Sequence, residues 1–313
     1  MKESYYSLGL MSGTSMDGVD ASIIKTDGKT RYSAILDKYY EYPSVIYNNL
    51  LKLRAKIKTS KDLKKYDKQI KIAEKEITIF HAESVKKILR ETKVKVDFVG
   101  FHGQTIFHNV KEKISKQLGD GKLLSKLIKK NVVYNFRKND LANNGEGAPL
   151  APIFHKLLVT KYKIKTPLII LNIGGIANIT SSINKKYELI SSKDIGPGNC
   201  LIDRWIRLKS NKKYDKNGLI AKSGNINKFI LNRYLDNFYN NELNKKKSYD
   251  INDFDIYFAK KLSLKDGAAT LTEFTADICS KKLVNGSVYV TGGGRKNNFL
   301  VRSIKKKFQV ILV

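Results

Sequence analysis

The sequence predicts an α/β protein built from two related lobes. Residues 5–25 and residues 167–181 share one pattern, in which an apolar strand runs into a glycine-containing turn and a second strand follows at once. After each of them, segments with strand and helix periodicity alternate along the chain. A length of 313 residues is enough for two domains of ordinary size. We therefore expect two lobes, residues 1–164 and residues 165–313, related as an internal repeat.

The composition is that of an ordinary globular chain, with 42% hydrophobic residues. No run approaches the roughly 20 apolar residues that span a bilayer, and the first residues lack the apolar region of a secretory signal. Cys200 and Cys279 are too few for a disulfide framework, and no Cys/His spacing resembles a zinc site. These observations predict a cytoplasmic protein that makes no use of a membrane.

The formal net charge of +30 raises the question of nucleic-acid binding. The basic residues are mostly lysines and are dispersed along the whole chain, among many Asn, Ile and Tyr residues that share A/T-rich codons. A nucleic-acid site requires a clustered basic footprint or a recognisable motif, and neither is present in the sequence. We therefore expect a solvated basic surface and no nucleic-acid partner.

The first turn has the sequence Ser12-Gly13-Thr14-Ser15 and joins the strands expected at residues 5–10 and 19–25. Small residues and hydroxyls in such a turn let backbone N–H groups and Oγ atoms converge on an anion. The turn is therefore a candidate phosphate site. An ordinary hairpin with a glycine in its turn is the alternative interpretation.

The rest of the first lobe continues the alternation of strands and helices. A strand is expected at residues 31–42, helices at 45–57 and 63–92, and a short buried strand at 96–101. Open α/β folds place ligands at the C-terminal ends of strands, so the polar side chains that follow the last of these are site candidates. They are His102, Gln104, Thr105 and His108. A purely structural role is the alternative for the histidines.

Another strand, at residues 131–136, is followed directly by Arg137. A guanidinium just past a strand end could hold a substrate or a phosphoryl group, or it could be an ordinary surface charge. A Gly-Glu-Gly-Ala-Pro stretch at residues 145–149 then precedes a helix expected at 150–162.

In the second lobe the glycine turn is formed by Gly174 and Gly175, and Asn178 lies on the strand after it. Each of the two turns could hold phosphate from one side of a shared cleft. After a strand near residues 187–190, Asp194 begins the segment Asp-Ile-Gly-Pro-Gly-Asn. Its residues 196–198 force a tight turn before a helix that starts at Asn199, which would bring Asp194 near the N-terminus of that helix. A carboxylate there can accept a proton from an attacking nucleophile, although turn capping is the alternative.

The C-terminal part is mostly helical, with helices expected at residues 225–238, 253–264 and 268–284. A strand at 287–291 runs into Gly292, Gly293 and Gly294, and Asn297 with Asn298 opens a helix. Three glycines after a buried strand allow a base or ribose to approach the backbone closely. The last six residues, 308–313, are expected to form a buried strand.

Six segments, in chain order, resemble the anhydro-N-acetylmuramic acid kinase family of the actin and sugar kinase superfamily. They are MSGTSMDGVD, FHGQTIFH, NFRKNDLA with GEGAPLAP, LNIGGIANI, DIGPGN and VTGGGRKNNFL. The resemblance implies a two-lobed actin-like ATPase (sugar kinase) fold with a central cleft, and the use of ATP and Mg²⁺. It also implies that water opens the 1,6-anhydro ring of the amino sugar while O6 takes the γ-phosphoryl group, which gives N-acetylmuramic acid 6-phosphate for peptidoglycan recycling.

The resemblance also implies roles for individual residues. Asp194 matches the general base that deprotonates the attacking water. The ATP phosphates are assigned to Ser12, Gly13, Thr14, Ser15, Asp17, Gly174, Gly175 and Asn178. Adenosine is assigned to Gly292, Gly293, Gly294 and Asn297, and the sugar to His102, Gln104, Thr105 and Arg137. Mg²⁺ would be held through the ATP phosphates, with Asp17 as a further candidate ligand.

Two departures from the family pattern keep an alternative open. The family carries Lys-Ser-Thr-Gly-x-Glu before an aromatic residue, whereas Lys247 and Ser248 are followed here by Tyr-Asp-Ile-Asn. Family members also continue past the position of Val313 with a helix that bears acidic residues. A catalytically impaired nucleotide-binding remnant of the family is therefore the alternative expectation, and a homodimer is a further one.

Overall fold

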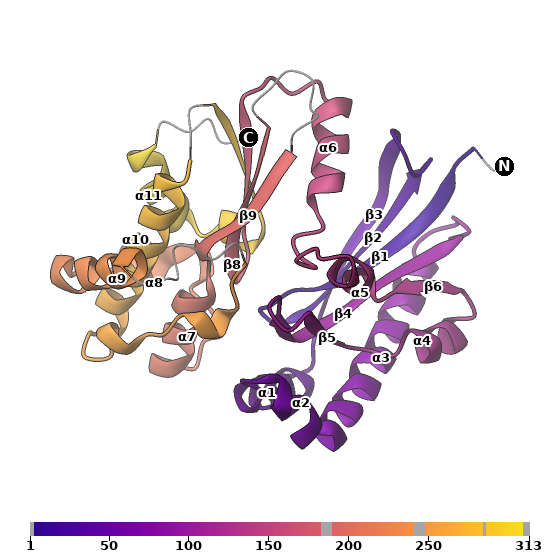
Figure 1. Cartoon of the computed structure of the whole chain (residues 1–313), viewed down its shortest axis with the longest axis horizontal. Helices are drawn as coiled ribbons and strands as arrows, with labels where there is room; N and C mark the ends of the chain where they lie inside the picture. The colour runs from indigo at the N-terminus through magenta and orange to yellow at the C-terminus, as the bar shows by residue number, and fades with distance from the viewer. Residues whose placement is uncertain (1–2, 183–189, 241–247, 284–285, 309–313) are drawn as a thin grey trace. The chain divides into compact units, whose positions relative to one another are not determined.

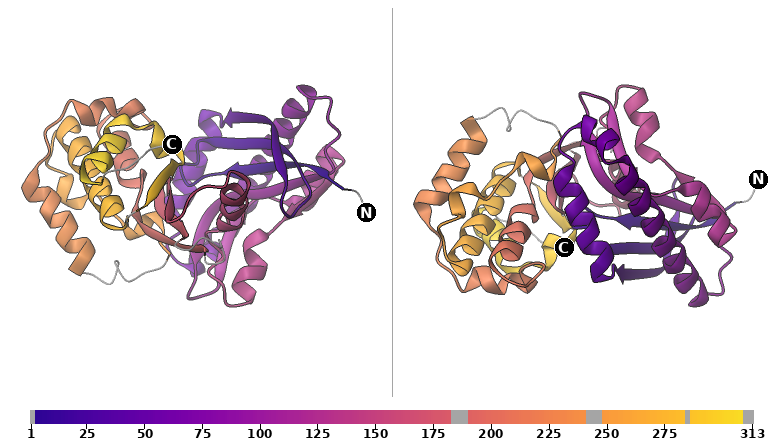
Figure 2. Two further views of the ribbon diagram at one scale, coloured as in Figure 1. Left: turned by 90° about the horizontal axis from the view of Figure 1, so that it is seen from above. Right: turned by 90° about the horizontal axis from the view of Figure 1, so that it is seen from below.

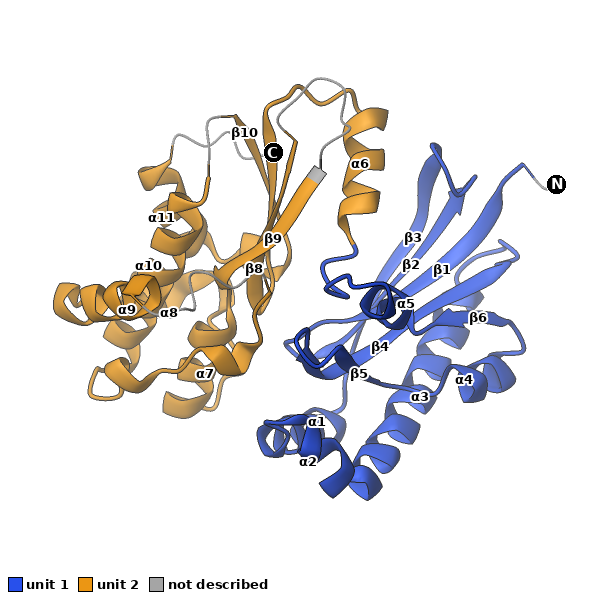
Figure 3. Ribbon diagram, viewed as in Figure 1, with its two compact units in different colours: residues 1–150 blue, residues 151–313 orange. Residues whose placement is uncertain are grey.

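The computed structural model describes residues 3–182, 190–240, 248–283 and 286–308. The chain divides into two compact units, Met1–Leu150 and Ala151–Val313 (Figure 3). Each unit contains one sheet together with helices, so the predicted α/β class is confirmed. Within the described residues, none of the helices combines the length and the apolar composition needed to cross a membrane.

Unit 1 contains a mixed sheet with the strand order β3-β2-β1-β4-β5, and β6 also pairs with β4 (Figure 1). β1 to β3 form an antiparallel meander, and β4 runs parallel to β1 and to β6 but antiparallel to β5. The strands are β1 (Tyr5–Ser12), β2 (Gly18–Thr26), β3 (Tyr32–Glu41), β4 (Phe98–Asn109), β5 (Ile114–Leu118) and β6 (Asn131–Tyr134).

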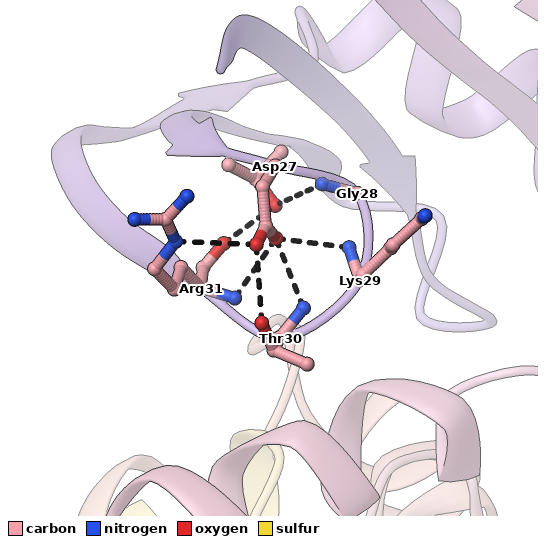
Figure 4. A network of polar contacts seen from close by, with 6 residues as sticks. Asp27, Gly28, Lys29, Thr30 and Arg31 are labelled. Carbon is pink, nitrogen blue, oxygen red and sulfur yellow. Dashed lines mark hydrogen bonds and ion pairs between the residues drawn. The ribbon is translucent and has the colours of Figure 1, made fainter. Parts of the chain in front are cut away.

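The hairpin between β2 and β3 is closed by Asp27 (Figure 4). Its carboxylate accepts hydrogen bonds from the backbone N–H groups of Lys29, Thr30 and Arg31, each at 2.9 Å. These bonds hold the pKa of the Asp27 carboxyl well below its usual range. The carboxylate therefore serves the turn itself, as Asp side chains commonly do.

The helices of unit 1 are α1 (Ser44–Lys56), α2 (Ser60–Lys65), α3 (Asp67–Arg90), α4 (Gly121–Ile128) and α5 (Phe136–Ala142). Helix α3 covers one face of the sheet (Figure 2), and its fully buried Ile77 and Val85 belong to the same hydrophobic core as Leu8 of β1 and Ile23 of β2. The single helix predicted at residues 63–92 is wrong in one respect, because the chain leaves helical geometry at Tyr66 and forms α2 and α3.

The sheet of unit 2 has the same arrangement as strands β1 to β4 of unit 1. Its strand order is β10-β7-β8-β9, where β7 to β9 form an antiparallel meander and β10 runs parallel to β7. The strands are β7 (Leu168–Ile173), β8 (Ile176–Ser182), β9 (Ile190–Pro197) and β10 (Ser287–Thr291). The predicted internal repeat of two related α/β lobes is thus confirmed at the level of topology.

Helices cover both faces of the second sheet. They are α6 (Pro152–Lys161), α7 (Cys200–Lys209), α8 (Leu219–Lys222), α9 (Lys228–Asn240), α10 (Leu264–Lys281) and α11 (Asn298–Lys307). On one face, Leu171 and Ile173 of β7 pack against residues of α10 and α11. On the other face, Val159 of α6 packs against Leu168 and Ile170 of the same strand.

Helix α6 lies with unit 2, whereas the sequence placed the lobe boundary at its far end, after residue 164. Besides the apolar packing of Val159, the Nδ1 atom of His155 on α6 lies 2.8 Å from the Oγ1 atom of Thr180 on β8. These contacts tie the helix to the second sheet, so the division falls after Leu150.

Two further predictions concern the C-terminal part. The helix expected at residues 253–264 is wrong, because the structure has only single 3₁₀ turns at Ile251–Asp253 and Tyr257–Ala259. Aspartate side chains accept backbone N–H bonds in this segment and favour turns over a continuous helix. The strands expected at 187–190 and 308–313 fall almost wholly outside the described residues.

Candidate active site

The first turn follows directly after β1. The Met16 N–H donates to the Gly13 carbonyl at 3.2 Å, and the Met16 side chain is buried with a positive φ of 59°. Thr14 is half-buried and Ser15 is exposed. The Ser15 hydroxyl donates to the half-buried Asp17 carboxylate at 2.5 Å, and the Tyr39 side chain is hydrogen-bonded to the same carboxylate.

Ser12, a predicted phosphate residue, and Gln104, a predicted sugar residue, have buried side chains that hold the turn from the protein interior. Ser12 is 1% exposed, and its Oγ atom lies 2.8 Å from the Tyr42 hydroxyl and 3.2 Å from His81 Nε2. Gln104 is fully buried, and its Nε2 donates to the Gly13 carbonyl at 2.9 Å. Both side chains therefore point into the protein below the turn.

The segment from His102 to His108 lies inside β4, so the prediction that it follows the strand is wrong. Pairing with β5 extends β4 past Phe101, and His108 Nδ1 lies 3.0 Å from the hydroxyl of its cross-strand partner Ser115. Thr105 is buried, and its Oγ1 accepts from Gln117 Nε2 at 3.3 Å. His108 and Thr105 thus take part in the pairing of β4 with β5.

His102 and Arg137, both half-buried, form a direct pair. The Arg137 Nε donates to His102 Nε2 at 3.1 Å, and His102 Nδ1 donates to the Gly103 carbonyl at 2.8 Å. With Nε2 accepting and Nδ1 donating, the imidazole is neutral. Burial, reinforced by the guanidinium, lowers the pKa of His102 to about 4. The structure thus joins two of the four predicted sugar-side residues.

His81 has a similarly low pKa, and the two histidines predict an acid-sensitive unit 1. Burial lowers the pKa of His81 from 6.5 to about 4. Below pH 6.5 the unfolded chain takes up protons that the folded chain refuses, so the free energy of unfolding falls with falling pH. We expect a loss of about 2 kcal/mol per histidine between pH 6.5 and roughly pH 5.

Urea unfolding followed by circular dichroism across this range measures the effect. The His102→Gln variant removes one of the two histidines of unit 1 with a pKa near 4, so it should lose about half of the pH dependence that these two contribute. An unchanged slope in that variant would show that His102 is not held neutral by the fold.

In unit 2, four polar residues occupy one register position across the sheet. Asn172 is the Cα partner of Thr291 on one side and of Asn178 on the other, and Asn178 is the partner of Asp194. Directly opposite residues on paired strands point to the same face of a sheet, so the four side chains form a row. All four are half-buried, and the Thr291 hydroxyl donates to Asn172 Oδ1 at 3.4 Å.

Asp194 ends this row on β9. It lies within the strand, which continues to Pro197, so the prediction of a tight turn at Gly196, Pro197 and Gly198 is wrong for the first two of these residues. One carboxylate oxygen, Oδ2, accepts from the Tyr249 N–H at 2.9 Å. The Tyr249 ring packs 5.3 Å from the ring of Phe254 and 6.3 Å from that of Phe238, which fixes the position of this donor. Lys247, which precedes it in the expected family motif, lies outside the described residues.

The second glycine turn packs beside this row. Its carbonyls accept from the start of the segment that leads into α7, with Asn199 N donating to Gly174 at 2.8 Å and Gly198 N donating to Gly175 at 3.0 Å. A Cβ on Gly198 would collide with the Gly174 carbonyl. A Cβ on Gly292, whose φ is 79°, would lie 2.6 Å from Asn172 Oδ1. The fold itself therefore requires glycine at 198 and 292.

Three other glycines in these turns are not required by the fold. A Cβ on Gly13 would meet its nearest neighbour at 3.7 Å, and one on Gly174 at 3.4 Å, which are ordinary contact distances. A Cβ on Gly293 would have nothing within 4 Å. None of the three has a φ in the left-handed region. Gly294, in contrast, is buried against Ile173.

Asn297, predicted to contact adenosine, is a buried helix cap. Its Oδ1 accepts from the Leu300 N–H at 3.0 Å at the start of α11. The prediction that this residue opens a helix is confirmed. Its side-chain oxygen is thus engaged in capping, and Gly293 is the exposed member of the predicted adenosine segment.

Two α/β units with the same strand order, each carrying a glycine turn after its first strand, define an actin-like protein of the ATPase and sugar kinase class. More specifically, the chain belongs to the anhydro-N-acetylmuramic acid kinase family, whose sequence profile matches residues 5–313.

Individual relatives agree with this membership. The chain is 55% identical to the anhydro-N-acetylmuramic acid kinase of Pelagibacter ubique (strain HTCC1062), over 98% of the chain and 84% of that protein. It is 36% identical to that of Brucella canis, over 94% of the chain and 81% of that protein. Among solved structures, component A of (R)-2-hydroxyglutaryl-CoA dehydratase from Acidaminococcus fermentans aligns with 98% of this chain and 90% of that chain, at 13% identity and a TM-score of 0.49. The two sequence relatives, both named as kinases, favour a kinase over the alternative of an impaired remnant.

Proposed function

We propose that the protein transfers the γ-phosphoryl group of ATP to O6 of 1,6-anhydro-N-acetylmuramic acid while water opens the anhydro ring. The product is N-acetylmuramic acid 6-phosphate, an intermediate suited to peptidoglycan recycling in the cytoplasm. In the structure, the main support for this proposal is glycine at positions 13, 174 and 293. At each of these positions the fold has room for a side chain. Close approach of a ligand to the backbone is a physical reason for glycine at such positions.

The proposed binding roles follow from what each element exposes. The turn at residues 13–15 would hold ATP phosphates with backbone N–H groups. In the second turn the Gly174 N–H donates to the Ile176 carbonyl at 3.2 Å, so the Gly175 N–H would serve there and Asn178 would add a side-chain donor. Gly293 would lie against adenosine.

On the sugar side, we assign the half-buried His102 and Arg137. The Arg137 Nε donates to His102, and a guanidinium is suited to hydrogen-bond the carboxylate or hydroxyl groups of the sugar. The neutral imidazole fixes the direction in which this guanidinium points. Gln104 and Thr105, in contrast, are buried and belong to the support of the site.

Asp194 would act as the general base. One of its oxygens takes a proton from water as the water oxygen bonds to C1 of the sugar. The C1–O6 bond breaks and leaves its electron pair on O6, which then bonds to the γ-phosphorus as the bond from that phosphorus to ADP breaks. The Tyr249 N–H donates to Oδ2 at 2.9 Å and so helps to fix the position of the carboxylate.

Mg²⁺ fits this arrangement as an ion held mainly by phosphate oxygens. Within the described residues there is no group of three or more His, Cys, Asp or Glu side chains that could hold a metal alone. Mg²⁺ in kinases typically binds one or two carboxylates together with substrate phosphates and water, and Asp17 offers one half-buried carboxylate beside the first turn. When bound, the ion would neutralise charge on the transferred phosphoryl group.

The direct test is incubation with ATP, Mg²⁺ and the anhydro sugar, followed by mass spectrometry of the sugar product. We expect the mass of the sugar to increase by one phosphoryl group and one water. Addition of the phosphoryl group alone would mean that the ring stays closed, and the proposed reaction would be wrong. ATP binding without any product would support the impaired remnant. The same preparation examined by sedimentation tests the predicted homodimer.

A further inference from the structure

We infer that a buried chain of three side chains, Tyr42, Ser12 and His81, together with Gln104, positions the first phosphate turn for ATP. None of the four would touch the nucleotide, so they are positioning residues. The inference rests on the proposed function, because it concerns the turn assigned there to the ATP phosphates. His81 and Tyr42 belong to none of the sequence motifs, and they meet Ser12 only in the folded chain.

The hydrogen bonds of this chain can run in only one direction. His81 Nδ1 lies 2.7 Å from the Ile77 carbonyl, which can only accept, so Nδ1 carries the proton. Burial lowers the pKa of His81 to about 4, which keeps the ring neutral and leaves Nε2 as an acceptor. The Ser12 hydroxyl, 3.2 Å away, must therefore donate to Nε2. Its oxygen then accepts from the Tyr42 hydroxyl at 2.8 Å.

The direction of the chain decides what Ser12 can offer to a ligand. Its one hydroxyl proton is directed to His81, and its side chain is 1% exposed. Ser12 therefore anchors the end of β1 to α3, and it supplies no hydroxyl to the phosphates. Tyr42 contributes a second tie to the turn, because its backbone N–H donates to the Asp17 carbonyl at 2.8 Å.

Gln104 holds the other side of the turn. Its side-chain amide donates to the Gly13 carbonyl, and Gln104 is the Cα partner of Ser12 in the parallel pairing of β1 and β4. Gln104 thus holds the Gly13 carbonyl, and of the two residues that follow, Thr14 is half-buried and Ser15 is exposed. Among the described residues neither of their backbone N–H groups has a hydrogen-bond acceptor, which is the state expected of donors reserved for an anion.

Two substitutions of His81 distinguish a role in positioning the first phosphate turn from a role in packing alone. In His81→Gln, the Oε1 atom can take the place of Nε2 and accept from Ser12. In His81→Asn, the amide can still donate to the Ile77 carbonyl but cannot reach Ser12. We expect His81→Asn to raise the Kd for ATP, measured by calorimetry, and the KM for ATP about tenfold with little change in kcat. His81→Gln should stay within about threefold of the unmodified protein.

Tyr42→Phe provides a second test that does not alter the helix. It should raise the Kd for ATP severalfold alone and have no further effect in a Ser12→Ala background, because both changes break the same chain. Tyr40→Phe, on β3, is the matched control and should leave the Kd unchanged. The Tyr40 hydroxyl is buried, and none of the described residues forms a hydrogen bond with it.

The outcomes separate this inference from the proposed function. Unchanged ATP affinity in both His81→Asn and Tyr42→Phe would overturn the inference while product formation still stands. Equal losses in His81→Gln and His81→Asn, or additive effects of Tyr42→Phe and Ser12→Ala, would also overturn it. Absence of product in the unmodified protein with intact ATP binding would instead contradict the proposed function, and the ATP measurements would still test the chain.

Discussion

The Asp194→Asn variant is expected to lose turnover by roughly 10²- to 10⁴-fold while it keeps its affinity for ATP. The amide has nearly the shape of the carboxylate, and its oxygen can still accept the hydrogen bond from the Tyr249 N–H. It cannot take a proton from water. The variant therefore removes the proposed base and preserves the row that Asp194 forms with Asn178. Steady-state rates of product formation and calorimetry with ATP measure the two quantities.

Asp236→Asn is the matched control, because Asp236 is an exposed carboxylate on α9 of the same unit. It should change neither turnover nor ATP affinity. If Asp194→Asn retains full turnover, the carboxylate does not accept the proton of the attacking water. If it loses ATP binding and turnover together, Asp194 holds the nucleotide, and its assigned role is wrong.

The Gly13→Ala and Gly174→Ala variants are expected to fold normally and to raise the KM for ATP by roughly 10- to 100-fold each. In the folded protein an added methyl group at either position makes only ordinary contacts. In the complex with ATP it would separate the backbone N–H groups from the phosphate oxygens and weaken charge-assisted hydrogen bonds. Circular dichroism and thermal unfolding verify the fold, and initial rates at varied ATP concentration give the KM.

Gly9→Ala is the control for these variants. Gly9 lies on β1, four positions before Gly13, and a Cβ there would meet its nearest neighbour at 3.9 Å. Its substitution should leave the KM for ATP near that of the unmodified protein. Normal ATP kinetics in both Gly13→Ala and Gly174→Ala would show that the nucleotide does not approach the two turns closely, and the phosphate assignment would be wrong.

The glycine turns and the repeated strand pattern could be predicted from the sequence because they are local. Each turn joins strands that are adjacent in the chain, and glycine, apolar runs and alternation mark such units directly. The short distance between Asp194 and Asn178 follows from the antiparallel pairing of β8 and β9, which are also close in sequence. These features needed no long-range information.

The support of the first turn could not be predicted, because it depends on contacts between distant segments. His81 is 69 residues from Ser12, and Gln104 is 91 residues from Gly13. One signal was present in the sequence. His81 falls on the apolar stripe of α3, between Ile77 and Val85, and a buried polar side chain at such a position needs a partner. The identity of the partner depends on how α3 packs on the sheet.

The extent of β4 and the missing helix after Asp253 have different causes. The polar residues of β4 resemble a strand end, yet pairing with β5 continues the strand through them. In the segment after Asp253, the apolar residues have helical spacing, but Asp255 accepts the Tyr257 N–H at 2.6 Å and closes a turn. Local side-chain bonds to the backbone outweighed the periodicity there.

The most direct test of the account is to run the reaction in water enriched in ¹⁸O and to locate the label in the product. The sugar is reduced with borohydride at once, so that the oxygen on C1 cannot exchange. If the water activated by Asp194 attacks C1, the heavy oxygen is found on C1 and the phosphoryl group at O6 carries none. Label in the phosphoryl group, or its absence from C1, would contradict the account.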